Sequence, residues 1–149
     1  MKVRQDVDSA SEVSFYKIQG ETLADKLTFA CRLAEKGVSL EHSVFILVES
    51  HEQLEELDEK LWTFSSSSFV PHGFENTETH EGEVTIGTEL PSSKHADVLI
   101  NLKAAPFANP NQFNRITEII MQDDPHLASA RKRYRSYQEL GLKPKMVSI

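Results

Sequence analysis

Apolar positions near the start of the chain recur first with the period of a strand and then with that of a helix. Residues 13–18 alternate between apolar and polar side chains, which is typical of a strand. From Thr22 to about Lys36 the spacing is helical, with an apolar face of Leu23, Leu27, Ala30, Cys31 and Ala34. Thr22 and Asp25 have the spacing of a capping box, and Gly37 fits a left-handed C-terminal cap. The pattern predicts a strand followed by a capped helix.

The next segment repeats this order. Residues 43–48 form a continuous apolar run rich in β-branched side chains, which favours a strand buried on both faces. Ser50 is the predicted N-cap of a helix that reaches about Phe64. Its predicted inward residues are Leu54, Leu57, Leu61 and Trp62. Four serines at 65–68 end the helix, and residues 69–73 are expected to be extended, because a residue before proline disfavours helix.

Three shorter segments follow before the last helix. Residues 73–82 are polar and acidic and are predicted to be a loop, whereas residues 84–86 and 97–102 are predicted strands. Residues 115–121 suit a helix or a strand. We assign a strand, because the alternation of strands and helices then continues.

The C-terminal part completes an α/β pattern. Pro125 favours the first turn of a helix that is predicted to reach about Leu140 and to stop at Gly141. Residues 145–149 suit a final strand at the edge of a sheet. The whole order predicts an α/β fold with three layers and a mostly parallel central sheet.

Composition is consistent with this fold and narrows the setting. The 149 residues suit a single domain, 1–149, whose residues 1–11 are expected to be frayed. The longest apolar run, residues 44–48, is far too short to cross a bilayer, and the N-terminal residues lack the apolar region of a signal peptide. Cys31 is the single cysteine, so neither a disulfide framework nor a cysteine-based zinc site is expected. These features favour the cytoplasm.

Charge is unevenly distributed along the chain. The net charge is −7, yet residues 125–149 carry six Lys or Arg against one Glu, a net +5. Residues 1–124 therefore carry −12. An acidic body repels nucleic acid, whereas a basic C-terminal helix attracts an acidic partner.

Motifs for catalysis or cofactor binding are missing from the sequence. The turn after the first strand contains only Gly20 and lacks both glycine-rich phosphate motifs, so no cofactor is expected. The six histidines are scattered, although a metal site assembled from distant residues stays open. The serines at 65–68 lie near His72, but no G-x-S-x-G motif surrounds them. A small α/β hydrolase or a nucleotide-handling enzyme is thus the weaker alternative.

The C-terminal helix carries the strongest functional signal. Residues 130–137 mix four cations with two tyrosines, and Arg131 and Arg135 form an i, i+4 stripe. A solvated helix face whose tyrosines pack on the sheet is one interpretation. Direct binding of single-stranded nucleic acid is a second, since basic and aromatic residues contact phosphates and bases. A third is an acidic peptide or a chain-terminal carboxylate, which arginine binds with two parallel hydrogen bonds.

Several of these segments together resemble one family. They are Phe15-Tyr16; Leu57-Asp58-Glu59-x-Leu61-Trp62 followed by Ser68-Phe69-Val70-Pro71-His72; residues 97–102; and Ala130-Arg131-x-Arg133-Tyr134-Arg135-x-Tyr137 followed by Gly141. Their order and spacing are similar to those of the chi subunit of bacterial DNA polymerase III over nearly the whole chain. The central motif is the specific one, whereas the basic helix alone would be a weak signal.

The resemblance implies a Rossmann-like fold without nucleotide binding and a non-catalytic subunit of the replicative polymerase. It implies two partners. One is the psi subunit, which connects chi to the clamp loader; some members join a helicase of the XPD/DinG-like class instead. The other is the acidic C-terminal tail of single-stranded DNA-binding protein, which ends in phenylalanine.

By position, the resemblance also implies two groups of binding residues. Arg131 would contact the terminal carboxylate of the tail, with Tyr134 and Arg135 beside it and Ile120 as an apolar wall. The psi-facing surface would consist of Phe69, Trp62, Val70 and Pro71, although core packing explains Trp62 and Pro71 equally well. One departure is Leu127, which stands where a lysine is expected in the family.

Overall fold

The computed structural model describes residues 12–20, 22–63, 72–74, 82–90, 96–105, 113–122 and 124–148. Its elements, in chain order, are β1 (Glu12–Lys17), α2 (Leu23–Ser39), β2 (Val44–Leu47), α3 (His51–Thr63), β3 (His72–Phe74), β4 (Val84–Gly87), β5 (Ala96–Asn101), β6 (Phe113–Ile120), α4 (Asp124–Glu139) and β7 (Lys145–Ser148). No helix of this described part is both long enough and apolar enough to span a membrane.

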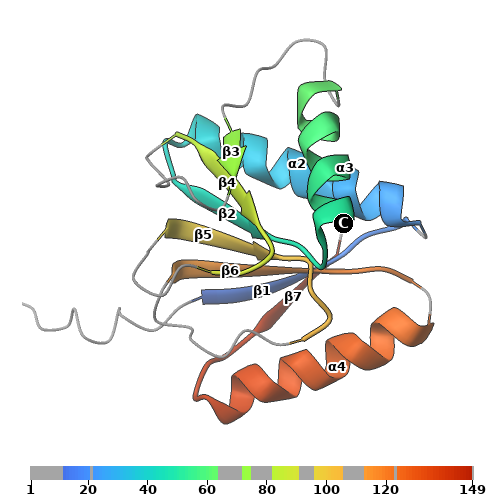
Figure 1. Cartoon of the computed structure of the whole chain (residues 1–149). Coiled ribbons are helices and arrows are strands. Elements are labelled where there is room, and N and C mark those ends of the chain that lie inside the picture. The colour runs from blue at the N-terminus through green and yellow to red at the C-terminus, as the bar shows by residue number, and fades with distance from the viewer. Residues whose placement is uncertain are drawn as a thin grey trace, which may run out of the picture.

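The strands form one sheet in the order β3-β4-β2-β5-β6-β1-β7. All six neighbouring pairs are parallel. Helices α2 and α3 lie on one side of the sheet, and α4 lies on the other (Figure 1). The predicted three-layer α/β architecture is therefore confirmed.

Two apolar clusters hold the layers together, one on each face of the sheet. The first joins α2 and α3 to residues such as Ile46 and Ile119, and the second joins α4 to residues such as Phe45 and Ile120. Phe45 and Ile46 are neighbours in β2, as Ile119 and Ile120 are in β6, because successive side chains of a strand point to opposite faces. This explains why the central strands are continuously apolar rather than alternating.

Helix α2 begins as predicted but ends differently. The hydroxyl of Thr22 accepts a hydrogen bond from the Asp25 amide, and the Asp25 carboxylate accepts one from the Thr22 amide, both at 3.2 Å. The prediction that Gly37 caps the C-terminus is wrong, because α2 continues to Ser39 and the left-handed residue is Glu41. A Cβ atom on Gly37 would lie 2.8 Å from Cγ2 of Val44. This glycine is therefore required by close helix–strand packing.

Helix α3 confirms the predicted Ser50 cap, since the Ser50 hydroxyl accepts a hydrogen bond from the Gln53 amide at 3.2 Å. Leu54, Leu57 and Leu61 are buried as predicted. The inward position of Trp62 is wrong, because its side chain is 57% exposed. At about 100° per residue, Trp62 lies roughly 140° around the helix from Leu57, on a different face.

The remaining elements follow the predictions with one exception. The strand assigned to residues 115–121 is confirmed as β6, and the edge position of β7 is confirmed by the strand order. Gly141 follows α4 with a φ of 88°, the left-handed conformation that glycine adopts readily. The loop predicted for residues 73–82 is wrong at its start, because residues 73 and 74 belong to β3. Three residues are too few to show a strand period.

Candidate functional site

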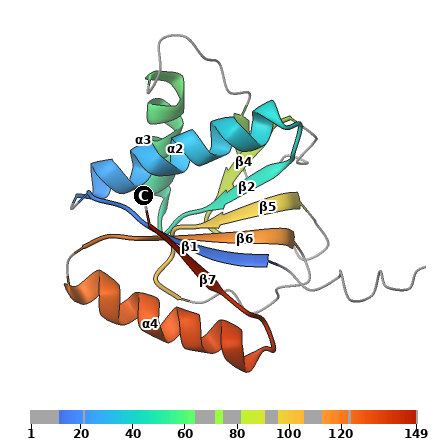
Figure 2. The same ribbon diagram turned by 180° about the vertical axis from the view of Figure 1, so that it is seen from behind.

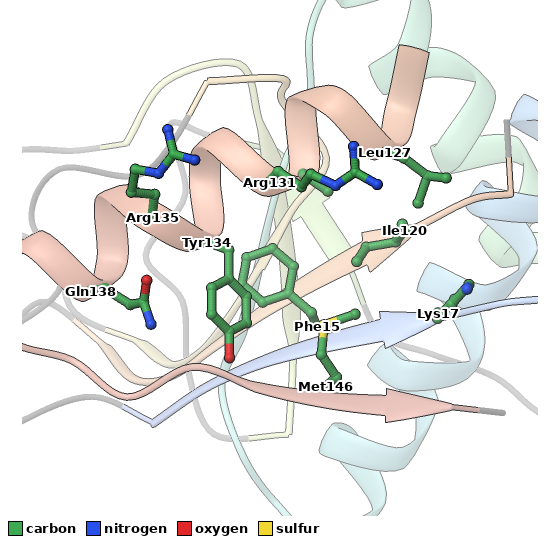
Figure 3. A pocket seen from close by; sticks show the side chains of 10 residues that line it. Phe15, Lys17, Ile120, Leu127, Arg131, Tyr134, Arg135, Gln138 and Met146 are labelled. Atoms are coloured by element: carbon green, nitrogen blue, oxygen red, sulfur yellow. The ribbon is translucent and has the colours of Figure 1, made fainter. Parts of the chain in front are cut away.

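A groove lies between α4 and the strands β1, β6 and β7 (Figure 3). Its volume is about 440 Å³, and its lining residues are Phe15, Lys17, Ile120, Leu127, Ala130, Arg131, Tyr134, Arg135, Gln138 and Met146. We call it the α4 groove. It brings together the four residues that the family resemblance assigned to one partner site, namely Arg131, Tyr134, Arg135 and Ile120.

The floor of the α4 groove is aromatic and closely packed. Phe15 of β1 is fully buried, and its ring centroid lies 5.2 Å from that of Tyr134 and 6.0 Å from that of Tyr137. The Tyr134 hydroxyl donates a 2.8 Å hydrogen bond to the carbonyl oxygen of Pro144, just before β7. Tyr134 is therefore held at both ends and presents a fixed ring face.

Cations line the rim. Arg131 and Arg135 are exposed and lie one turn apart on α4, about 6 Å along its axis. Within the described ranges, neither guanidinium forms an ion pair. In Figure 3, Arg131 and Lys17 lie toward the Leu127 end of the groove, and Gln138 lies at the opposite end. The groove thus combines an apolar floor with cations that have no counter-ion among the described residues.

A buried ion pair determines which side of α4 faces outward. Arg133 Nε donates a 2.8 Å hydrogen bond to Glu118 Oε1 in β6. Glu118 Oε2 accepts from the Tyr137 hydroxyl at 2.6 Å and from Asn101 Nδ2 at 2.9 Å. Burial raises the pKa of the Glu118 carboxyl, whereas Arg133 and these hydrogen bonds act in the opposite direction. Two of these donors, Arg133 and Tyr137, belong to α4 and fix it against the sheet, and the third, Asn101 of β5, holds the carboxylate from within the sheet.

The ion pair also ties α4 to the loop after β5. Arg133 Nη1 donates to the carbonyl oxygen of Ala104 at 3.2 Å and to the Ser129 hydroxyl at 2.6 Å. The Ser129 hydroxyl in turn donates to the Ala104 carbonyl at 3.2 Å. Because Arg133 lies about 200° around the helix from both Arg131 and Arg135, burying Arg133 leaves the other two arginines at the surface.

The sequence did not single out several residues that the structure places in or beneath the α4 groove. For Lys17 the sequence contains a feature that could have identified it, since Val13, Phe15 and Lys17 share one face of β1 and only Lys17 is charged. Glu118 could have been identified in the same way, because it is a carboxylate within the mainly apolar C-terminal half of β6. Arg133 could also have been identified, because the helical period places it three residues after Ala130 and four before Tyr137, on the inward face of the helix and away from Arg131 and Arg135.

The second predicted group is only partly described. Phe69, Val70 and Pro71 lie outside the described residues, so their assignment to a psi-facing surface stays a prediction. Trp62 is described, and it lies exposed at the C-terminal end of α3. Its exposure removes the core-packing interpretation for this residue.

The turn before α2 is the place where Rossmann-like folds bind phosphate. Here the Asp25 carboxylate already accepts a hydrogen bond from the Thr22 amide at 3.2 Å. A Cβ atom on Gly20 would lie 2.4 Å from that of Asp25, so the turn is filled by this side chain. A carboxylate in that position repels a phosphate. Within the described residues, no group of three or more His, Cys, Asp or Glu side chains is arranged to hold a metal ion.

Known proteins show similarity over almost the whole chain. A family model described as the DNA polymerase III chi subunit, HolC, matches residues 11–145. The DNA polymerase III subunit chi of Pseudomonas aeruginosa is 36% identical over 132 residues, which cover 88% of this chain and 92% of that protein. The corresponding subunit of Escherichia coli is 28% identical over 135 residues, covering 86% and 91%, and that of Haemophilus influenzae is 29% identical over 140 residues, covering 89% and 93%.

Proposed function

The chain belongs to the DNA polymerase III chi subunit family, and we propose that it is a non-catalytic link between the clamp loader and the single-stranded DNA-binding protein. In this proposal it acts in the cytoplasm, binds the acidic C-terminal tail of the DNA-binding protein through the α4 groove, and binds psi through a separate surface. The observation that carries the proposal is the α4 groove, where cations without an ion-pair partner in the described ranges surround an apolar floor.

The groove suits a peptide end that carries both a carboxylate and an aromatic side chain. The exposed guanidinium of Arg131 can hold a terminal carboxylate with two parallel hydrogen bonds. Phe15, Ile120 and the Tyr134 ring provide apolar surface for the last side chain. Arg135, one turn further along α4, can attract the preceding acidic residues.

Lys17 bears on the departure from the family pattern at Leu127. Leu127 lines the groove where a lysine is expected in the family, so one cation of the rim is replaced by an apolar side chain. Lys17 of β1 lines the same end of the groove and provides a positive charge from a different element (Figure 3). In this proposal Lys17 replaces part of the missing attraction.

The second surface would carry psi or, in its place, a helicase of the XPD/DinG-like class. Trp62 supports this part of the proposal, because exposed tryptophan is enriched where proteins bind one another. Phe69, Val70 and Pro71 follow it in the sequence and would extend the same surface. The two surfaces would allow one subunit to hold both partners at once.

Calorimetric titration with a peptide that ends in an acidic residue and a free-carboxylate phenylalanine tests the tail site. We expect Arg131→Ala to weaken binding by about 1.5–3 kcal/mol, the range for a charged hydrogen bond. Lys132→Ala is the matched control, because Lys132 is the adjacent exposed cation of α4 and does not line the groove. The same peptide with an amidated C-terminus should lose affinity for the wild-type protein. Equal binding by Arg131→Ala and the wild type would contradict the assignment.

A further inference from the structure

A second groove lies on the opposite face of the sheet, between the C-terminal half of α2 and the strands β1, β5 and β6. Its volume is about 520 Å³. Figure 2 shows α2 above these strands, on the side that α4 does not cover. We call this the α2 groove; nothing in the proposed function uses it.

The α2 groove has an apolar interior. Tyr16 and Phe29, both half-buried, face each other with ring centroids 5.7 Å apart. Val98 and Leu33 add aliphatic surface, and Leu40, 58% exposed, stands at the far end. From Phe29 to Leu40 the helix advances about 16 Å, which is the length of about five residues of extended chain.

The rim is basic, in contrast to the acidic body around it. Arg32 and Lys36 of α2 stand on one side, and Arg115 of β6 stands on the other. Glu12 is the one carboxylate in the lining, and it lies 3.5 Å from Arg115 in an exposed pair. Arg32 and Lys36 form no ion pair within the described part of the chain. Three of the ten cations in residues 1–124 thus gather around one apolar groove.

We infer that the α2 groove binds an extended segment of a partner protein in which acidic and apolar residues alternate. Arg32 and Lys36 are one turn apart, about 6 Å along α2. In an extended chain, side chains on the same side repeat about every 6.6 Å. Acidic residues at every second position therefore match the two cations, while the residues between them point to the Tyr16–Phe29 interior.

Two features separate this site from the α4 groove. The cations flank a groove whose length suits a continuous segment, so recognition does not depend on a terminal carboxylate. The two grooves also lie on opposite faces of the sheet and share no lining residue. Nucleic acid is the less favoured occupant, because its dense negative charge meets the net −12 of residues 1–124.

The experiment uses the isotopically labelled full chain, observed by amide NMR at low salt. The probe is the blocked peptide acetyl-Asp-Phe-Asp-Leu-Asp-amide, which has no terminal carboxylate. We expect saturable shifts at Tyr16, Arg32 and Lys36, and no saturable shifts at Arg131 and Tyr134. The rearranged peptide acetyl-Asp-Asp-Asp-Phe-Leu-amide has the same composition without the alternation, and it should bind more weakly.

Charge reversal tests the rim. Arg32→Glu with Lys36→Glu should weaken the probe about tenfold, since two attractive surface pairs become repulsive. Lys132→Glu with Lys143→Glu changes the net charge equally outside both grooves and should leave binding unchanged. Arg32→Gln with Lys36→Gln, which only removes the charges, serves if the reversed variant does not fold.

Four results would overturn the inference. They are the absence of saturable shifts, shifts confined to the α4 groove, equal weakening by the control pair, and displacement of the probe by oligothymidine that shifts the same residues. The last would assign the α2 groove to nucleic acid. Because the probe lacks the free carboxylate that the α4 groove requires, failure here leaves the proposed tail site intact.

Discussion

At the scale of single residues, Glu118 and Arg133 show how a buried pair controls the surface. Neither side chain is accessible to a partner, since both are almost fully buried. Their contact nevertheless fixes the rotation of α4 about its axis and thereby exposes Arg131 and Arg135. Burying two charges is unfavourable unless each is paired and hydrogen-bonded, and here Tyr137, Asn101 and Ala104 complete the pairing.

Glu118→Gln removes the charge while keeping the shape, so Arg133 is left buried without a counter-ion. We expect the free energy of unfolding near neutral pH to fall by about 3–5 kcal/mol, measured by urea titration. Tyr137→Phe keeps the ion pair and removes one hydrogen bond to the carboxylate, so it should lose about 1.5–3 kcal/mol. A Glu118→Gln protein as stable as the wild type would show that the carboxyl is already protonated and that no charged pair exists.

Cys31 gives a prediction about pH. Burial against the apolar cluster of α2 raises the pKa of its thiol to about 12, from an ordinary value of 9.0. Below pH 9 the thiol is protonated in both states, whereas between pH 9 and 12 only the unfolded chain ionises. Stability should therefore fall as the pH rises through this window, by up to about 1.4 kcal/mol per pH unit.

Cys31→Ala provides the control for this pH effect, because tyrosines and lysines titrate in both proteins. The difference in unfolding free energy between wild type and variant, measured from about pH 8 to about pH 11, should shrink in the alkaline range. A constant difference would contradict a raised thiol pKa.

Whether the role of a residue can be predicted from the sequence depends on whether the interactions that determine it lie nearby in the chain. Cys31 was predicted as a core residue from its place on an apolar helix face, and its burial confirms this. Arg131, Tyr134 and Ile120 were brought to one site by resemblance, and the structure places them in one groove. The pairing of Arg133 with Glu118 joins a helix to a strand 15 residues earlier, and no local pattern records it.

At the scale of elements, the contact between α2 and β2 explains a glycine that helix propensity does not. Gly37 lies inside α2, where alanine would ordinarily stabilise the helix by about 1 kcal/mol. Val44 opens the next strand and fills the space above this glycine, so that its Cγ2 would lie 2.8 Å from an alanine Cβ at position 37. Both residues are buried, so neither can move into solvent.

We therefore expect Gly37→Ala to destabilise the protein by about 1–3 kcal/mol, the usual effect of overpacking. Val44→Ala alone should also destabilise, because it leaves a cavity. The double variant should be more stable than the sum of the two losses implies, since the new methyl group then occupies the vacated space. Additive losses in urea denaturation would show that Gly37 does not pack on Val44.

Helix and strand positions were largely predictable, whereas their ends and outward faces were less so. The capping residues Thr22 and Ser50 identify helix starts because their hydrogen bonds are local. The reason for a glycine at position 37 is its contact with Val44, and the exposure of Trp62 depends on whether Leu61 or Trp62 is the residue that packs against the sheet. These are tertiary choices, and apolar periodicity alone does not distinguish them.

At the scale of the whole molecule, alternating strands and helices were enough to predict the layers but not the grooves. The α4 groove is lined by β1, β6, α4 and β7, which meet only because β1 lies between β6 and β7 in the sheet. That strand order is not encoded in any local period. The uneven charge was visible in the sequence, and the fold places cations of the basic C-terminal part along the α4 groove. The cations of the α2 groove come from the acidic part of the chain, and no charge pattern in the sequence brings them together.

This charge distribution predicts how binding responds to salt and to nucleic acid. Raising the salt concentration from about 50 to about 500 mM shortens the range of electrostatic attraction severalfold, so the tail peptide should bind progressively more weakly. Arg131→Ala should reduce this salt dependence more than Lys132→Ala does, because only Arg131 lines the groove.

Oligothymidine should not bind measurably at physiological salt, since residues 1–124 carry −12 and repel its phosphates. Fluorescence anisotropy with labelled peptide and labelled oligothymidine compares the two ligands directly. Comparable affinities would instead favour direct binding of single-stranded nucleic acid by α4, and the acidic body would then have failed to act as the barrier that its charge implies.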